Sequence, residues 1–159
     1  MSTNLFQTGH LNELQLQELA QRVASTLSIG DVLLLEGPVG AGKTTFARAA
    51  LKSILLEDED VPSPTFTLVQ TYETTRGPLW HCDLYRISSA TELEELGLAE
   101  AFEDSICLVE WPEVLGNHAP STALTLTIAP NNDGTARSVR ARGDPHVWAK
   151  VVQHAPMFV

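Results

Sequence analysis

The 159-residue chain carries 20 acidic and 10 basic residues, a formal net charge of −10, and 43% of its residues are hydrophobic. This size and hydrophobic content predict a single domain over residues 1–159 with one good core. The negative charge argues against direct binding to a nucleic-acid backbone. No apolar run approaches the roughly 20 residues of a transmembrane helix, and the N-terminus lacks the pattern of a secretory signal, so we expect no membrane attachment.

Both cysteines, Cys82 and Cys107, lie in apolar, strand-like runs. This favours buried free thiols in a reducing compartment over a disulfide framework. His81 has no second histidine or cysteine at metal spacing, so we interpret it as a packed strand residue and expect no structural zinc. Together these features predict a cytoplasmic protein.

The first predicted element is a helix over residues 11–27, where apolar residues recur along one helical stripe. Thr8 or Asn12 would cap its start. A leading helix is not part of the minimal phosphate-binding unit. It would either cover one face of the sheet, which we favour, or close over the base or ribose of a nucleotide.

Residues 37–44, with the sequence GPVGAGKT, match the phosphate-binding loop G-x-x-x-x-G-K-[ST]. An apolar run of strand length, Val32–Leu35, precedes the loop, and a run rich in helix formers follows it and predicts a helix ending near Leu56. Strand, glycine loop and helix are the context that the motif requires, which argues against an ordinary glycine turn. Loop amides and the helix N-terminus then form a site for phosphates, with Lys43 at the two outer ones.

Two strands over residues 65–72 and 79–85 surround a short turn, which predicts a hairpin and a mixed sheet. Ser63, Thr65 and Thr67 lie where phosphate-loop proteins place a segment that senses the terminal phosphate. Turn chemistry next to proline explains the same hydroxyl residues. Both interpretations stay open.

A capping box at Thr91–Glu94 predicts the start of a helix that continues to Phe102, with Gly97 weakening its middle. The later predicted elements are strands over 106–110 and 123–128, a turn at 131–134, a returning strand over 136–141 and a short helix that begins near 144. The whole pattern predicts an α/β protein with the three-layer P-loop NTPase fold, whose mixed, mostly parallel central sheet is flanked by helices.

Phosphoryl transfer needs a divalent ion held by the loop hydroxyl and by a carboxylate at the end of a neighbouring strand. Thr44 supplies the hydroxyl, and Asp83 and Glu110 compete for the second role. Glu110 follows four uninterrupted apolar residues, which places it at the carboxyl end of a buried strand, where ligands gather in open α/β sheets. We therefore expect magnesium at Thr44 and Glu110, and a water-orienting or water-mediated role for Asp83.

Arg137, Arg140 and Arg142 form the one arginine cluster of the sequence, and we expect their spacing to place them on one face of a strand. A solvated surface is the favoured interpretation. Trp111 follows Glu110 and either stacks on a base or partner or packs in the core. The sequence favours neither role for Trp111.

Five sequence blocks occur in the order of one known family: GAGKTT at 40–45, SPTFTLV at 63–69, HCDLYR at 81–86, EELG at 94–97 and CLVEWP at 107–112. Over roughly residues 10 to 142 the chain thus resembles the TsaE family, small bacterial ATPases needed for threonylcarbamoyladenosine formation in tRNA. The loop block is unspecific by itself. The SPTFTLV, DLYR and VEWP segments at these spacings make the resemblance specific.

The resemblance implies a protein that binds ATP or ADP with Mg²⁺ and hydrolyses ATP slowly alone. Its partner would be a separate heterodimer that contains the threonylcarbamoyl-transferring subunit. This heterodimer would stimulate ATP hydrolysis, and the hydrolysis would reset the heterodimer between turnovers. The chain would contact tRNA only indirectly. By motif, the resemblance implies catalytic roles for Lys43, Asp83 and Glu110, with the metal at Thr44 and Glu110. It also implies nucleotide contacts at Val39, Gly40, Ala41, Gly42, Lys43, Thr44, Thr45, Glu13, Thr65, Trp111 and Arg137.

The chain departs from the family pattern in the loop and after it. Pro38 replaces the usual acid and Val39 the usual leucine, and a proline cannot donate an N–H to a phosphate. Phe66 replaces a common tyrosine and loses its hydroxyl. The loop motif itself is intact.

Two other functions fit the same loop. A small-molecule P-loop kinase fits the length, but seven arginines, scattered apart from the late cluster, make an arginine-rich lid hard to build. A nucleotide-gated binding module would need no hydrolysis. The guanine-specific segment Asn-Lys-x-Asp is absent from the sequence, which favours adenine.

Overall fold

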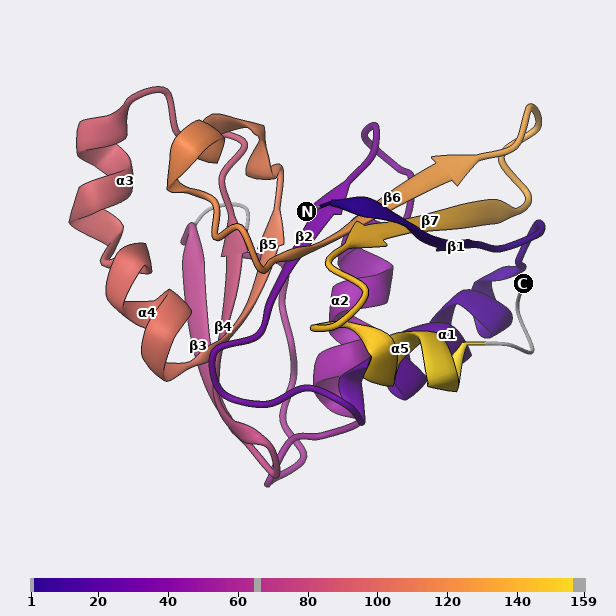
Figure 1. Ribbon diagram of the computed structural model, residues 1–159, viewed down its shortest axis with the longest axis horizontal. Coiled ribbons are helices and arrows are strands. Elements are labelled where there is room, and N and C mark those ends of the chain that lie inside the picture. The colour runs from indigo at the N-terminus through magenta and orange to yellow at the C-terminus, as the bar shows by residue number, and fades with distance from the viewer. Residues whose placement is uncertain (1, 65–66, 156–159) are drawn as a thin grey trace.

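The computed structural model describes residues 2–64 and 67–155, built around a seven-stranded sheet of order β1-β7-β6-β2-β5-β4-β3 (Figure 1). The strands are β1 (Thr3–Gln7), β2 (Val32–Glu36), β3 (Val69–Thr74), β4 (Gly77–Asp83), β5 (Ile106–Glu110), β6 (Leu124–Pro130) and β7 (Arg137–Gly143). The four central strands, β6, β2, β5 and β4, run parallel. Antiparallel strands complete both edges, which confirms the predicted mixed sheet.

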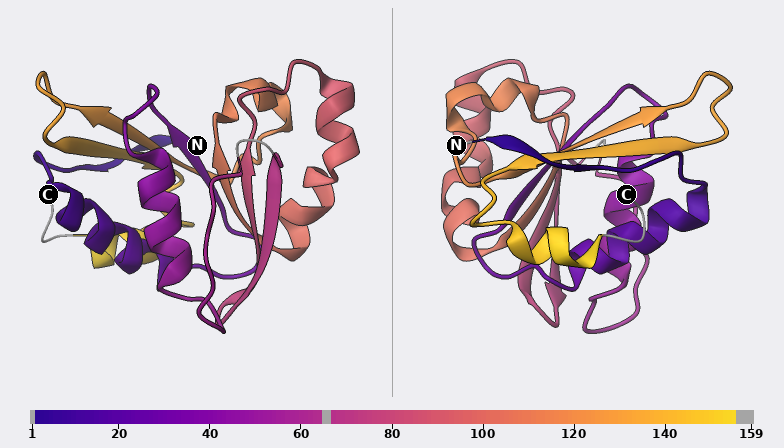
Figure 2. Two further views of the ribbon diagram at one scale, coloured as in Figure 1. Left: turned by 180° about the vertical axis from the view of Figure 1, so that it is seen from behind. Right: turned by 45° about the vertical axis from the view of Figure 1, so that its right-hand side comes forward.

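Helices cover the sheet on both sides and form three layers (Figure 2). They are α1 (Glu13–Ala24), α2 (Lys43–Lys52), α3 (Ala90–Leu96), α4 (Leu98–Asp104), the 3₁₀ helix η1 (Pro112–His118) and α5 (Ala149–His154). In β2, Leu33 and Leu35 pack toward α1, α2 and α5, whereas Val32 and Leu34 pack toward α3, α4 and η1. This alternation gives each face its own apolar core. No helix of the described residues is long and apolar enough to cross a membrane.

The leading helix forms over Glu13–Ala24, inside the predicted range 11–27, and covers the sheet as expected. Asn12 caps α1, because its side chain accepts from the backbone N–H of Gln15 while the Gln15 side chain accepts from that of Asn12. The apolar stripe of α1 is buried in the core that α1 shares with α2 and the sheet. Thr8 does not cap α1; its hydroxyl accepts from the N–H of Val139 and ties the end of β1 to β7.

The helix predicted from Thr91 to Phe102 is two helices. Its cap is Ser89, two residues earlier than expected, whose hydroxyl accepts from the N–H of Glu92. Gly97 has φ +76° and ends α3 just before α4 begins. Because a left-handed residue cannot continue an α-helix, Gly97 separates two helices and is not a weak point inside one.

Other boundaries also differ from the prediction, and one strand was missed. β3 begins at Val69, because the preceding Leu68 has φ +66° and cannot continue an extended strand; the first two residues of the predicted strand, 65 and 66, lie outside the described residues. α2 ends at Lys52, short of Leu56. β1 was not predicted at all: its short, mostly polar sequence becomes a strand through pairing with β7 at the far end of the chain.

Candidate functional site

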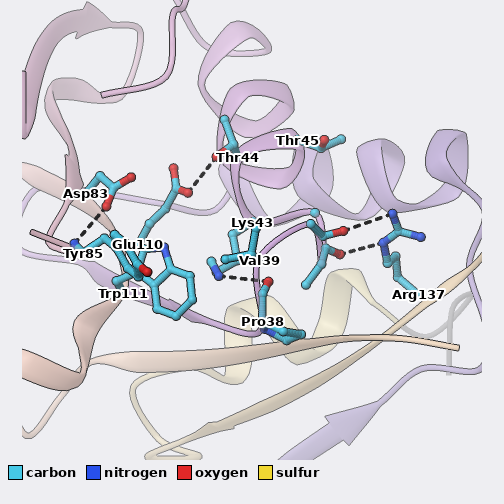
Figure 3. A pocket seen from close by; sticks show the side chains of 13 residues that line it. Pro38, Val39, Lys43, Thr44, Thr45, Asp83, Tyr85, Glu110, Trp111 and Arg137 are labelled. Carbon is cyan, nitrogen blue, oxygen red and sulfur yellow. Dashed lines mark hydrogen bonds between the residues drawn. The ribbon is translucent and has the colours of Figure 1, made fainter. Parts of the chain in front are cut away.

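A cavity of about 390 Å³ opens where β2, β4 and β5 end (Figure 3). Because these strands are parallel, their carboxyl ends meet at one side of the sheet. The fold thereby joins segments that are far apart in sequence. The described lining residues are 38–45 of the loop and α2, Asp83 and Tyr85 after β4, Glu110 and Trp111 after β5, and Arg137 of β7.

The loop runs from β2 into the first turn of α2 and lies close against its surroundings. A Cβ on Gly37 would come within 2.4 Å of the carbonyl oxygen of Ile128 in β6. Gly42 has φ +109° and precedes α2 with no side-chain cap. The first N–H groups of α2 lack acceptors within the helix, and such groups bind anions. The glycines therefore let the backbone itself form one wall of the cavity.

Lys43 begins α2 and is almost completely buried, with 5% of its surface exposed. Its Nζ donates to the carbonyl oxygens of Gly37 and of Pro38, the latter at 3.2 Å. The same nitrogen lies 3.5 Å from the ring centroid of Trp111. The ammonium group is thus held inside the cavity by loop carbonyls and an aromatic face.

Charge around Lys43 is mainly acidic. Burial lowers the pKa of Lys43, and the carboxylates of Glu110, Glu113 and Asp83 oppose that shift. The ammonium group of Lys43 therefore lies within the electrostatic influence of three carboxylates. This arrangement suits a ligand that brings both anionic phosphates and a divalent cation.

The two candidate acids lie side by side at the ends of β4 and β5, where Asp83 pairs in register with Glu110. Glu110 is 2% exposed, and its Oε1 accepts from the Thr44 hydroxyl at 2.7 Å. Its Oε2 lies 2.7 Å from Nε2 of the fully buried His81. Asp83 accepts from the backbone N–H of Tyr85 through Oδ1 at 2.9 Å. The loop hydroxyl and one of the two strand-end carboxylates are thus in direct contact, and their binding of magnesium stays a prediction.

His81 is the residue that sequence reasoning undervalued. It is packed in a strand, as expected, but it also bonds the acid predicted to hold the metal. A signal was available, because residues two apart on a strand share a face and His81 is two residues before Asp83.

The arginine cluster is split between the two faces of β7, contrary to the prediction. Residues 137 and 140 are an odd number apart, so a strand points them to opposite sides. Arg140 is exposed, as expected of a surface residue. Arg137 instead donates from Nε to the carbonyl oxygen of Ala41 at 2.7 Å and from Nη2 to that of Gly40 at 3.3 Å. It therefore holds the loop through the loop backbone.

Trp111 lines the cavity and belongs to neither apolar core among the described residues. Its ring lies 4.9 Å from that of Tyr85, centroid to centroid, and its backbone is left-handed with φ +55°. A bulky residue seldom adopts this conformation. Trp111 therefore lies at the cavity and not in the core, and its stacking on a base or partner stays a prediction.

Other predicted contacts lie beside the cavity or outside the described residues. Glu13 lines two neighbouring grooves instead, one with Thr45 and Arg137 and one with Thr45 and Arg48. Thr65 lies outside the described residues. Ser63 and Thr67 are not among the described residues that line the cavity. The roles of Glu13, Ser63, Thr65 and Thr67 stay predictions.

The side-chain atoms that could bind a metal ion at this site are oxygens, those of Thr44, Asp83 and Glu110. In the described part of the chain no group of three or more histidine, cysteine or acidic side chains is arranged to hold a metal ion. Thr44 and the strand-end carboxylates match a Mg²⁺ that takes one or two carboxylates and completes its shell with phosphate and water. Cys82 and Cys107 are free and buried, as predicted, and burial raises the pKa of Cys107 to about 12.

Comparison with known proteins gives one family. The model of "Threonylcarbamoyl adenosine biosynthesis protein TsaE" matches residues 11–139. The tRNA threonylcarbamoyladenosine biosynthesis protein TsaE of Rickettsia bellii is 38% identical over 117 residues, 74% of this chain and 81% of that protein. The protein of that name from Bacillus subtilis is also 38% identical, over 74% of this chain and 73% of its own length.

A solved structure agrees with these relatives. The crystal structure of Bacillus subtilis YdiB matches with a TM-score of 0.73 and 28% identity, covering 97% of this chain and 96% of that one. The likeness therefore extends over nearly the whole of both chains. The chain belongs to the TsaE family.

Proposed function

We propose that this chain is a P-loop ATPase that binds and hydrolyses Mg-ATP in the biosynthesis of threonylcarbamoyladenosine in tRNA. The observation that carries the proposal is the 2.7 Å hydrogen bond between the Thr44 hydroxyl and Glu110 in the loop-walled cavity. A loop hydroxyl and a strand-end carboxylate are the protein groups with which P-loop NTPases hold magnesium. The names of the relatives support the place in tRNA modification.

Thr44 and Glu110 are the residues that would hold Mg²⁺. Both offer oxygen donors, and their hydrogen bond shows that the two side chains reach the same point from α2 and β5. The chemistry that the bound ion supplies is neutralisation of the charge on the phosphate oxygens. Glu110 is the last residue of β5, whose five residues are all buried, so the backbone that carries its carboxylate is held in place by packing.

The loop and Lys43 would bind the phosphates. Lys43 has three hydrogens to donate, now directed toward the carbonyl oxygens of Gly37 and Pro38, and phosphate oxygens are stronger acceptors for an ammonium group. Pro38 contributes no N–H, so the amides of residues 39–44 carry the backbone contacts. The first turn of α2 adds its partial positive charge.

Asp83 would orient the attacking water. It lines the cavity beside Glu110 and is held by the N–H of Tyr85. In hydrolysis the water oxygen bonds the γ-phosphorus while the bond from that phosphorus to the bridging oxygen of ADP breaks. A carboxylate that accepts a hydrogen bond from the water directs its lone pair at the phosphorus.

The partner would be the threonylcarbamoyl-transferase heterodimer, in the cytoplasm. The net charge of −10 supports a subunit that docks on proteins and leaves tRNA binding to others. ATP turnover would reset that complex between rounds of transfer.

The test is steady-state ATP turnover by the wild type and Lys43→Ala, with and without the purified heterodimer. We expect slow turnover that the heterodimer raises, and a loss of about 100-fold or more in Lys43→Ala, because a phosphate-binding donor is removed. Lys52→Ala is the matched control, since Lys52 lies exposed at the other end of α2. ATP turnover by Lys43→Ala at the wild-type rate would contradict the proposal.

The same assay separates the other functions. Phosphorylation of an added small molecule in step with ATP consumption would favour a kinase; among the described cavity residues, Arg137 is the only arginine available for a lid. Tight nucleotide binding that changes partner affinity without turnover would favour a nucleotide-gated binder.

A further inference from the structure

We propose that His81 is a positioning residue that holds Glu110 in the orientation in which it binds magnesium; this inference rests on the proposed function. His81 is fully buried in β4, and its Nε2 lies 2.7 Å from Oε2 of Glu110 in the neighbouring strand β5. The other oxygen of Glu110 is bonded by Thr44, also at 2.7 Å. Both carboxylate oxygens are therefore engaged, one by a strand and one by the loop helix.

The hydrogen bonds define the role of each atom. A carboxylate that binds a metal ion is ionised and only accepts, so in that state Nε2 of His81 and the hydroxyl of Thr44 would each donate a hydrogen to Glu110. Two donors on opposite oxygens fix the plane of the carboxylate. Each oxygen keeps a further lone pair, which is what a metal-binding carboxylate needs. Donors of this kind behind a metal ligand set its orientation and raise metal affinity.

Packing alone does not account for a histidine here. Nδ1 of His81 is buried and has no hydrogen-bond partner among the described residues. A buried nitrogen without a partner costs stability that an apolar side chain of similar size would not. In the described structure His81 makes one side-chain hydrogen bond, the one from Nε2 to Glu110. An apolar side chain at this position could not make it.

The test compares His81→Gln with His81→Asn. The amide nitrogen of glutamine stands the same number of bonds from the backbone as Nε2, whereas that of asparagine is one bond too short. Both variants bury an uncharged amide, so they are matched for polarity. Two affinities are measured for each: ADP without metal by calorimetry, and Mn²⁺ for the ADP-bound protein by electron paramagnetic resonance.

We expect Mn²⁺ affinity to fall about 10- to 100-fold in His81→Asn and to stay within about threefold of wild type in His81→Gln. Metal-free ADP affinity stays unchanged in both, because neither change touches the loop. Thermal unfolding confirms that each variant is folded. If His81→Asn does not fold, His81→Leu replaces it in the comparison. That variant is measured at a temperature below the midpoint of its own thermal unfolding.

Two negative results have different meanings. Equal Mn²⁺ affinity in the wild type and all folded variants overturns the role of His81 and leaves the proposed function standing. A wild type that binds ADP but no Mn²⁺ overturns the magnesium site itself, and with it this inference.

Discussion

β4 and β5 present two faces that are equally buried but chemically opposite. Toward α2 they carry His81 and Glu110, which are 0% and 2% exposed. Toward α3 and α4 they carry Cys107 and Val109, both 0% exposed. The first pair is joined by a hydrogen bond and reaches the loop helix, whereas the second pair packs among aliphatic side chains.

Burial therefore does not decide where the chemistry lies; the partners that cover each face do. α2 arrives with the hydroxyl of Thr44, so a carboxylate on that side keeps its hydrogen bonds. The opposite face meets apolar residues of α3, α4 and η1 and accepts only groups that need no partner. One pair of strands thus supports a polar site on one side and an ordinary core on the other.

The largest effect is expected from Glu110→Gln on the polar face. The substitution keeps the shape but removes the negative charge that would hold magnesium, so ATP turnover should fall about 100-fold or more. Phosphate release measured over a range of Mg²⁺ concentrations checks this. A rate close to that of the wild type would show that Glu110 does not bind the metal, and Asp83 would take its place.

Val109→Ala on the apolar face is the matched control, one residue away. It removes two buried carbon groups and should lower the free energy of unfolding by about 2 kcal/mol. Turnover per folded molecule should stay unchanged. The two variants together separate chemistry from stability: loss of turnover in a folded Val109→Ala would break the comparison of the two faces.

A smaller effect is expected from the buried thiol of Cys107. Burial raises its pKa from the ordinary 9.0 to about 12, so the folded state keeps a proton that the unfolded state loses. The contribution of Cys107 to the free energy of unfolding is therefore fully present below pH 9. It is lost as the pH rises from 9 toward 12, by up to about 1.4 kcal/mol per pH unit.

Urea unfolding at pH 8 and pH 10 under reducing conditions checks this for the wild type and Cys107→Ala. The variant should be less stable at pH 8 but lose less on going to pH 10. Some loss remains, because burial also raises the pKa of Cys82. Parallel losses in the two proteins would contradict the assignment.

The smallest effect is expected from Arg137, which supports the loop from β7 and is only half-buried. Arg137→Met removes its hydrogen bonds to the carbonyls of Gly40 and Ala41 and should weaken ADP binding about fivefold. Arg140→Met, on the opposite face of the same strand, should leave the affinity unchanged. Calorimetric titration of both variants with ADP measures the difference. Equal ADP affinities would show that Arg137 does not support nucleotide binding.

Much of the candidate site could be predicted from local sequence. The loop was predictable because glycines at fixed offsets between a strand and a helix have one common use, and Glu110 because it ends an uninterrupted apolar strand. Arg137 was misplaced because an odd spacing was read as one face. Gly97 was read as a weak helical residue although a left-handed glycine also ends helices.

The sequence by itself determined the elements whose causes are local: the apolar runs of β2 and β5, the apolar stripe of α1 and the glycine turn of the loop. Only the tertiary structure decided which side chains meet. Glu110 bonds His81 across 29 residues and Thr44 across 66, and Arg137 reaches Ala41 across 96. Such contacts depend on strand order and register, which long-range packing sets, and neighbouring residues carry no signal of them.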